Sequence, residues 1–153
     1  LVIHKNYPHI SNLILALEKA GAKLLLDEFL HAQFPHLPIA TDLDYQTEFL
    51  DERLSLKTVN TIEEAIQFIQ KYSSGHTEVI LSESNKNIDL FLHSLDSAAL
   101  FVNCSSRFHD GGEFGLGAEV GISTGKMHVR GPMGLMHLTT TTTILRGQGQ
   151  VRE

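Results

Sequence analysis

Helix-like and strand-like segments alternate from Leu1 to Asn103, and this alternation constrains the fold of the chain more than any other feature. The helical segments carry apolar residues at positions i, i+3 and i+7, as in Ile10, Leu13 and Leu17, whereas the strand-like segments are short and aliphatic. The expected strands cover residues 1–4, 23–26, 54–59, 78–82 and 98–103, and the expected helices cover residues 9–20, 27–33, 61–72 and 85–95. Such alternation predicts an α/β fold, with a mainly parallel sheet and flanking helices.

The helix that begins at Thr61 has the clearest start signal. Thr61 and Glu64 have the spacing of a capping box, and the apolar residues that follow, including Ile66, recur on one face. Residues 35–50, in contrast, are expected to be irregular around Pro38. The sequence therefore predicts regular structure on both sides of one irregular excursion.

The pattern changes after Asn103. Residues 111–134 are expected to be loop-rich with one helical turn, and residues 139–145, mostly threonine, predict a β-branched tail strand. We therefore expect residues 1–125 to form the α/β body and residues 126–153 to form a C-terminal β tail that reaches toward a partner.

The composition excludes several classes of protein. A length of 153 residues suits about one domain, and a net charge of −6 without a cluster of Lys and Arg argues against nucleic-acid binding. The apolar runs are short, so no membrane span is expected, and the start of the chain lacks a signal-peptide pattern. A single cysteine excludes a disulfide framework and fits a cytoplasmic location. Because the chain begins in a strand-like run without Met, we expect it to have been cut from a longer one.

The segment from Phe101 to Leu135 is the most informative for function. It holds eight of the twelve glycines together with arginines and acids. Glycine permits close backbone approach and positive φ, so this mixture indicates a ligand-facing surface. The spacing of Gly115, Gly117 and Gly121 differs from the dinucleotide fingerprint and lies too far from the preceding strand, so we reject a Rossmann phosphate site.

Polar side chains follow the last strand of the α/β body. They are Asn103, Ser105, Ser106 and Arg107. The carboxyl ends of parallel strands are where such sheets bind ligands, and hydroxyl, amide and guanidinium groups can together hold a carboxylate or a phosphate. In the alternative reading the segment is a plain loop, in which Arg107 pairs with Asp110 or Glu113.

Other residues leave alternatives open. Cys104 is either a nucleophile activated by Arg107 or His109, or a packed side chain, which is the commoner role for a lone cysteine after a buried strand. His76 lies in a helix-to-strand turn, where it either caps the helix or faces a pocket. Glu48 by itself is a solvated loop acid. None of the nine histidines has a metal-binding spacing, so no metal site is predicted.

These segments match a known family over a long stretch that needs no insertion or deletion. The matching positions are residues 48–50, 74–77, 102–103, 105, 107–108, 110–112, 114–120, 123–124, 128 and 130–135. On these residues the chain resembles the C-terminal third of γ-glutamyl phosphate reductase (glutamate-5-semialdehyde dehydrogenase), within the aldehyde dehydrogenase superfamily. The resemblance extends from Leu1 to about Leu138.

The resemblance implies an NADPH-dependent oxidoreductase of proline biosynthesis. In this family a cysteine thiolate displaces phosphate from L-glutamyl 5-phosphate, and hydride from NADPH reduces the resulting thioester to glutamate 5-semialdehyde. By the same resemblance, Glu48 binds the nicotinamide ribose, with Phe49 and Leu50 against the cofactor NADP(H). The residues expected to anchor the substrate or close its tunnel are Asn103, Ser105, Ser106, Arg107, Phe114 and Gly115.

The departures from the family pattern limit what this chain is expected to do alone. The family's catalytic cysteine and cofactor-binding domain precede the part that this chain resembles, and Cys104 stands where the family has alanine. Met136 replaces a usual Glu, and residues 141–143 replace a Tyr-Lys-Trp-like segment. We therefore expect no turnover from the chain alone. Its expected partner is the missing N-terminal part of the enzyme or a second copy bound through the tail.

Two alternatives belong to other classes. One is a non-catalytic binding or assembly module, such as a truncated gene product that pairs with a full-length partner. The other is an independent enzyme that uses Cys104 as its nucleophile.

Overall fold

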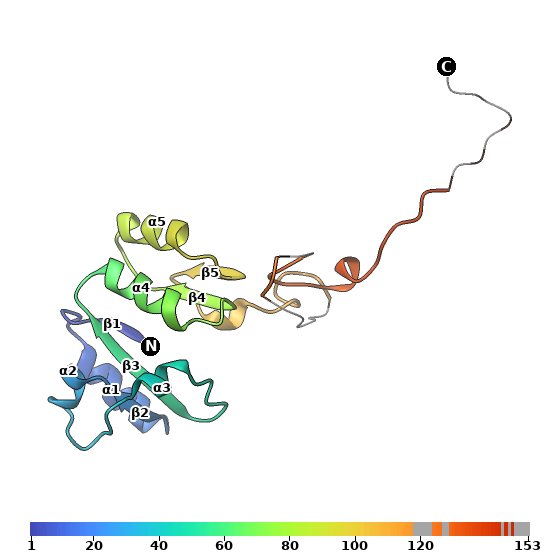
Figure 1. Cartoon of the computed structure of the whole chain (residues 1–153). Coiled ribbons are helices and arrows are strands. Elements are labelled where there is room, and N and C mark those ends of the chain that lie inside the picture. The colour runs from blue at the N-terminus through green and yellow to red at the C-terminus, as the bar shows by residue number, and fades with distance from the viewer. Residues whose placement is uncertain (118–123, 127–128, 145, 147, 149–153) are drawn as a thin grey trace. The chain divides into compact units, whose positions relative to one another are not determined.

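A computed structural model describes residues 1–117, 124–126, 129–144, 146 and 148 (Figure 1). The described residues form two compact units. The first unit consists of Leu1–Ser74 and Ser82–Asp96, and the second consists of Gly75–Leu81 and the described residues from Ser97 onward. The boundary expected near residue 125 lies within the second of these units.

The elements follow one another in the predicted alternation. In chain order they are β1 (Val2–His4), α1 (Ile10–Lys19), β2 (Lys23–Leu26), α2 (Glu28–His31), α3 (Asp42–Gln46), β3 (Arg53–Val59), α4 (Ile62–Tyr72), β4 (Thr77–Ile80), α5 (Asn85–Ser94), β5 (Ala99–Val102) and the 3₁₀-helices η1 (Ser106–Phe108) and η2 (Leu135–His137). Every strand and helix expected between Leu1 and Asn103 is present, with ends that differ by a few residues at most.

The sheet of the first unit is parallel, with strand order β1-β3-β2 (Figure 1). Ile3 is paired with Thr58 across β1 and β3, and Leu24 with Leu54 across β2 and β3. Parallel neighbours cannot be joined by a tight hairpin, and here α1 connects β1 to β2 while α2 and α3 lie between β2 and β3.

The core of the first unit lies between this sheet and its helices. Ile10 and Ile14 of α1 are both buried, as the apolar spacing predicts. They belong to one cluster with Leu24, Leu26 and Leu56 of the sheet. Burying such a side chain contributes about 1.5–3 kcal/mol, so this cluster is a main source of stability for the unit.

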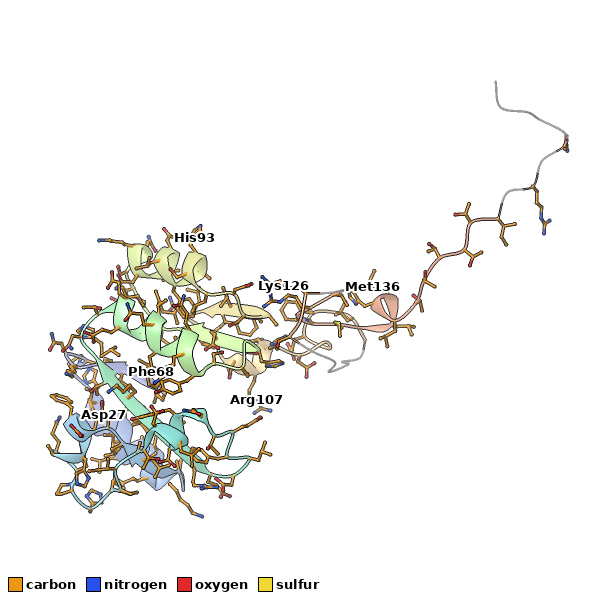
Figure 2. The ribbon with its side chains drawn as sticks, viewed as in Figure 1. Asp27, Phe68, His93, Arg107, Lys126 and Met136 are labelled. Atoms are coloured by element: carbon orange, nitrogen blue, oxygen red, sulfur yellow. The ribbon has the colours of Figure 1, made fainter. Side chains whose placement is uncertain are left out.

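One acidic side chain is buried beside the core. Asp27, which is 7% exposed, directly follows β2 and caps α2, because its Oδ1 accepts a hydrogen bond from the Leu30 amide at 3.1 Å. Its Oδ2 accepts hydrogen bonds from the Thr58 amide at 2.7 Å and the Thr58 hydroxyl at 2.6 Å, and Lys57 Nζ lies 3.6 Å away. A buried carboxylate is tolerated when it is paired and fully hydrogen-bonded. Asp27, labelled in Figure 2, therefore ties β2 and α2 to β3.

The segment between α2 and β3 is not wholly irregular, so the expectation for residues 35–50 was wrong in part. It contains α3, where Thr41 and Asp44 form a reciprocal capping box. The helix is little longer than one turn and buries no residue completely. It therefore offers no apolar periodicity from which a sequence pattern could predict it.

Aromatic rings connect α3 to α4. Tyr45 contacts Phe68 edge-to-face, with ring centroids 5.1 Å apart, and contacts Tyr72 at 5.8 Å. Its hydroxyl donates a hydrogen bond to the Leu56 carbonyl at 3.2 Å. Burial, with a smaller contribution from the negative charge of Asp27, raises the pKa of Tyr45 to about 12. The phenol therefore stays neutral, as a donor to β3, at any ordinary pH.

The start of α4 agrees with the sequence prediction except in one bond. The Glu64 amide donates to Thr61 Oγ1 at 3.2 Å, but the Glu64 carboxylate accepts from the Asn60 amide at 2.7 Å and not from that of Thr61. The other end of α4 is tied to α5, because Gln70 Nε2 donates to the Ser94 carbonyl at 2.8 Å.

The second unit is built on the parallel pair β4 and β5, in which Thr77 is opposite Ala99 and Ile80 is opposite Val102. In the same unit, Met133 is buried. Gly131, at φ +79°, has the Ala98 carbonyl 3.2 Å from where a Cβ would stand, so its backbone runs close to the start of β5.

The predicted β tail is not a strand in the described residues. Residues 139–144 have no strand assignment and are exposed, and residue 145 lies outside the described part. A threonine-rich run has strand propensity, but a strand forms only when a second strand pairs with it. The loop-rich reading of residues 111–134 falls partly on residues 118–123 and 127–128, which lie outside the described residues.

The predicted fold class is confirmed as α/β, with parallel strands and flanking helices. Among the described residues, the hydrogen-bonded strands form two sheets, where the sequence predicted one. Within the residues that the structure describes, no helix is long and apolar enough to cross a membrane.

The role of Asp27 gives a direct stability test. We expect Asp27→Asn to lower the free energy of unfolding by about 3 kcal/mol, because an amide nitrogen cannot accept the bonds from Thr58. Urea unfolding of the chain measures the change. Asp89→Asn, at an exposed position of α5, is the matched control and should change stability by less than about 0.5 kcal/mol. Equal effects for the two variants would contradict the assigned role.

Candidate functional site

The segment that follows β5 begins with a residue in an unusual conformation. Asn103 lies in the left-handed region at φ +53°, and its amide donates to the Ile80 carbonyl at 2.9 Å, so it is fixed against the end of β4. Asn is among the residues that adopt this region most readily. The left-handed residue turns the chain out of the sheet and into η1.

Ser105 organises the turn that carries Arg107. Ser105 Oγ accepts a hydrogen bond from the Arg107 amide at 3.2 Å, and the Ser105 carbonyl accepts one from the Phe108 amide at 3.2 Å. The Ser106 carbonyl in turn accepts from the His109 amide at 3.1 Å. These bonds form a single 3₁₀ turn that exposes the side chains of Ser106 and Arg107.

The ion pair considered as the plain-loop alternative is not formed. Arg107 is exposed, and Figure 2 shows its side chain extending away from the ribbon of η1. In the described part of the chain, its guanidinium has no carboxylate partner, and the Asp110 carboxylate instead accepts from the Gly112 amide at 2.6 Å. Within those residues, no side-chain bond occupies the guanidinium.

Phe114 and Gly115 close the turn that follows. The Phe114 amide donates to the Asp110 carbonyl at 3.2 Å, and the Gly115 amide donates to the Gly112 carbonyl at 3.0 Å. Gly115 has φ +70°, a conformation that a side chain would strain. The ring of Phe114 is exposed. The candidate substrate residues thus lie along one continuous segment of the second unit.

The candidate cofactor residues belong to the first unit, immediately before β3. Glu48 is exposed, and Phe49 lies under the Arg53 guanidinium at 4.5 Å from the ring centroid. Arg53 also forms an ion pair with Asp51 at 3.0 Å, and hydrogen bonds from Arg53 lower the pKa of the Asp51 carboxyl. Leu50 is 89% exposed and left-handed at φ +55°. A large apolar side chain is thus held outward on a strained backbone.

Sequence reasoning missed one cluster in the second unit. The His76 and His109 rings stack 4.6 Å apart, and each Nδ1 lies within hydrogen-bond distance of Thr77 Oγ1, at 2.8 Å and 2.6 Å respectively. Phe101 of β5 contacts His109 edge-on at 6.0 Å. The turn around His76 was a candidate from sequence. The contact between Thr77 and His109, however, joins residues 32 positions apart, and no spacing rule relates them.

Two candidate chemistries receive little support. Cys104 is partly buried, and in the described residues its thiol has no hydrogen bond or ion pair that would favour the thiolate. In the same residues, no group of three or more His, Cys, Asp or Glu side chains is arranged to hold a metal ion. Hydroxyl, amide and guanidinium groups are the polar groups that residues 103–107, directly after β5, expose.

Comparison with known proteins agrees with the sequence resemblance. The chain is 66% identical over 152 residues to a γ-glutamyl phosphate reductase from Leptospira biflexa, covering 99% of this chain and 36% of the relative. The crystal structure of γ-glutamyl phosphate reductase from Thermotoga maritima superposes over 100% of the chain and 37% of its own length, with a TM-score of 0.89 and 41% identity. This chain resembles the C-terminal third of γ-glutamyl phosphate reductase.

A more distant comparison shows the fold alone. An acetylating aldehyde dehydrogenase from Geobacillus thermoglucosidasius matches 97% of the chain and 44% of its own length, with a TM-score of 0.61 and 15% identity. No family model matches the chain. The chain spans about a third of the length of the γ-glutamyl phosphate reductases it resembles.

The conformation of Leu50 gives a test of stored strain. We expect Leu50→Gly to raise the free energy of unfolding by up to about 1 kcal/mol, because glycine adopts positive φ without strain and the exposed leucine contributes little burial. The same change at exposed Leu43 of α3 should lower stability by about 1 kcal/mol, since glycine is a poor helix former. Thermal unfolding measures the stability of both variants. A loss of stability in both would contradict the assignment of backbone strain to Leu50.

Proposed function

We propose that this chain is part of an NADP(H)-dependent reductase that converts L-glutamyl 5-phosphate to glutamate 5-semialdehyde in proline biosynthesis. The observation that carries the proposal is the 66% identity over 152 residues to a protein named γ-glutamyl phosphate reductase. The proposed enzyme is an oxidoreductase, and we place it in the cytoplasm.

In this proposal the segment after β5 anchors the substrate. Arg107 supplies a bidentate guanidinium for a phosphate or carboxylate, and the Ser106 hydroxyl is exposed on the same turn. The side chain of Asn103, which precedes the turn, is exposed as well and is proposed to contact the same anion. Phe114 and Gly115 form the adjoining turn that borders the substrate tunnel. The main structural support for an anion site is the exposed guanidinium of Arg107, which has no carboxylate partner among the described residues.

We further propose that residues 48–50 flank the cofactor. An exposed carboxylate at Glu48 suits the hydroxyl groups of a ribose, and the apolar side chains of Phe49 and Leu50 suit one face of a nicotinamide ring. The nicotinamide supplies hydride when it is bound. The role of this chain is then to orient the cofactor, because Arg53 packs on Phe49 and holds the segment in place.

The 153-residue chain by itself is proposed not to turn over. Its one cysteine, Cys104, lacks an activating partner in the described residues, and the family nucleophile belongs to another part of the enzyme. Residues 1–125 would then complete the catalytic domain, and residues 126–153 would form a tail that pairs with a second subunit. The exposed apolar side chains of the tail, Leu135, Met136, Leu138 and Ile144, support that pairing.

Fragment complementation tests the proposal. NADP⁺-dependent oxidation of glutamate semialdehyde in phosphate buffer is measured with this chain alone, and then with an N-terminal family fragment that ends after its catalytic cysteine. We expect activity only in the mixture. Activity of the chain alone would support Cys104 as the nucleophile. No activity in either assay would favour a non-catalytic binding or assembly module.

The anion site is tested in the active mixture. We expect Arg107→Ala to lower kcat/KM for the substrate roughly tenfold or more, because a charge-assisted contact to the substrate is lost. This corresponds to a loss of about 1.5–3 kcal/mol of transition-state stabilisation. Lys86→Ala, which removes one positive charge from exposed α5, is the control for net charge. If both variants behave like the unsubstituted chain, Arg107 does not belong to the site.

A further inference from the structure

Three side chains of the second unit share one hydroxyl group. Thr77 Oγ1, on the first residue of β4, lies 2.8 Å from His76 Nδ1 and 2.6 Å from His109 Nδ1. The two imidazoles stack at 4.6 Å with an interplanar angle of 20°. His109 is partly buried and has Phe101 of β5 against its edge. The cluster therefore joins the start of β4, β5 and the loop after η1.

The single hydroxyl hydrogen of Thr77 limits how the imidazoles of His76 and His109 can share that hydroxyl group. A threonine hydroxyl has one hydrogen, so it donates to one Nδ1 and accepts from the other when both imidazoles are neutral. When both rings are protonated, both Nδ1 atoms become donors and the hydroxyl must accept twice. Two stacked cations at 4.6 Å also repel each other. The pair of bonds that two neutral rings make with Thr77 therefore cannot persist unchanged when both rings are protonated.

Charged side chains also lie on the segments that carry the cluster. Arg107 of η1 adds a positive charge two residues before His109, and Asp110 adds a negative charge directly after it, although its carboxylate is already bonded to the Gly112 amide. On β4 the neighbour of Thr77 is Glu78, whose side chain points to the opposite face of the strand. β5 has no titratable side chain.

The cluster lies next to the proposed substrate segment. His109 is the residue directly after η1, and its amide donates to the Ser106 carbonyl at 3.1 Å, so the ring that binds Thr77 also fixes the end of the turn that presents Ser106 and Arg107. The remaining bonds of the turn are local, between residues 105 and 110. In this part of the chain, His109 links the turn to β4 through its side chain.

We propose that His109 is a positioning residue for the substrate anion, held by Thr77 and His76 so that the Arg107 turn keeps one orientation on β4. The proposal rests on the proposed function, because it assumes that this turn binds the anion. It adds a pH dependence, since imidazoles take up protons between about pH 8 and pH 5. As the pH falls through this range, the contacts among His109, Thr77 and His76 weaken. The turn that carries Arg107 then loses its order.

The experiment measures order and anion binding separately in the full 153-residue chain. Backbone ¹⁵N heteronuclear NOE values for residues 106–110 report the order of the turn at about pH 7.5 and about pH 5. Sulfate, whose charge does not change over this range, reports binding through shifts of the same amide signals. The variants are His109→Ala, His109→Asn and, as a matched control, His93→Ala on α5 of the first unit.

We expect the unsubstituted chain to lose order in residues 106–110 at the lower pH and to bind sulfate at least about fivefold more weakly there. His109→Ala should show low order at both pH values. His109→Asn, whose amide can bond to Thr77 but does not titrate, should keep the order at both. His93→Ala should behave as the unsubstituted chain does.

Two results would overturn the inference: unchanged order of the turn in His109→Ala, or a pH dependence in His109→Asn equal to that of the unsubstituted chain. A different result separates this inference from the proposed function. An ordered, pH-sensitive turn that binds no sulfate would contradict the anion site and leave the positioning by His109 intact.

Discussion

The buried carboxylate of Asp27 is the interaction on which the first unit depends. The apolar cluster supplies more free energy, but apolar contacts are non-directional and tolerate several arrangements. The carboxylate is directional: one oxygen caps α2, and the other accepts two bonds from Thr58 in β3. It therefore fixes the exit of β2 relative to β3. Since the Glu48–Leu50 segment leads directly into β3, the same carboxylate helps to determine where the proposed cofactor residues lie.

Strained backbone marks both candidate segments. In the part of the chain that the structure describes, the non-glycine residues with positive φ are Leu50 and Asn103, one beside Glu48 and Phe49 and the other at the start of the substrate turn. Strain of this kind persists where surrounding structure imposes it and is frequent at binding sites. The substrate segment was selected from sequence for chemical reasons and residues 48–50 by the family resemblance, so their shared backbone feature is an independent observation about them.

The sequence predicted the elements better than it predicted their side-chain partners. The apolar spacing of Ile10 and Ile14 and the cap at Thr61 are local signals, and the helices that they indicate are present. α3 was missed because a five-residue helix without a buried face has no periodic signal. The prediction of a tail strand was wrong for residues 139–144, because strand propensity does not supply a second strand to pair with.

The candidate site divides in the same way. Asn103, Ser105 and Arg107 could be selected because they follow a strand in sequence, and their turn is stabilised by bonds between near neighbours. The contact of His109 with Thr77 could not be selected, because it depends on how a loop returns to a strand 32 positions earlier.

The bond between Gln70 and the Ser94 carbonyl has a consequence for how the chain folds. β4 follows α4 and β5 follows α5, so the two strands of the second sheet leave from helix ends that this bond holds together. A parallel pair ordinarily requires closure of the whole connecting segment, at an entropic cost that grows with the length of free chain. Once α4 and α5 have docked, most of that closure is already complete. We infer that docking of α4 on α5 lowers the entropic cost of pairing β4 with β5.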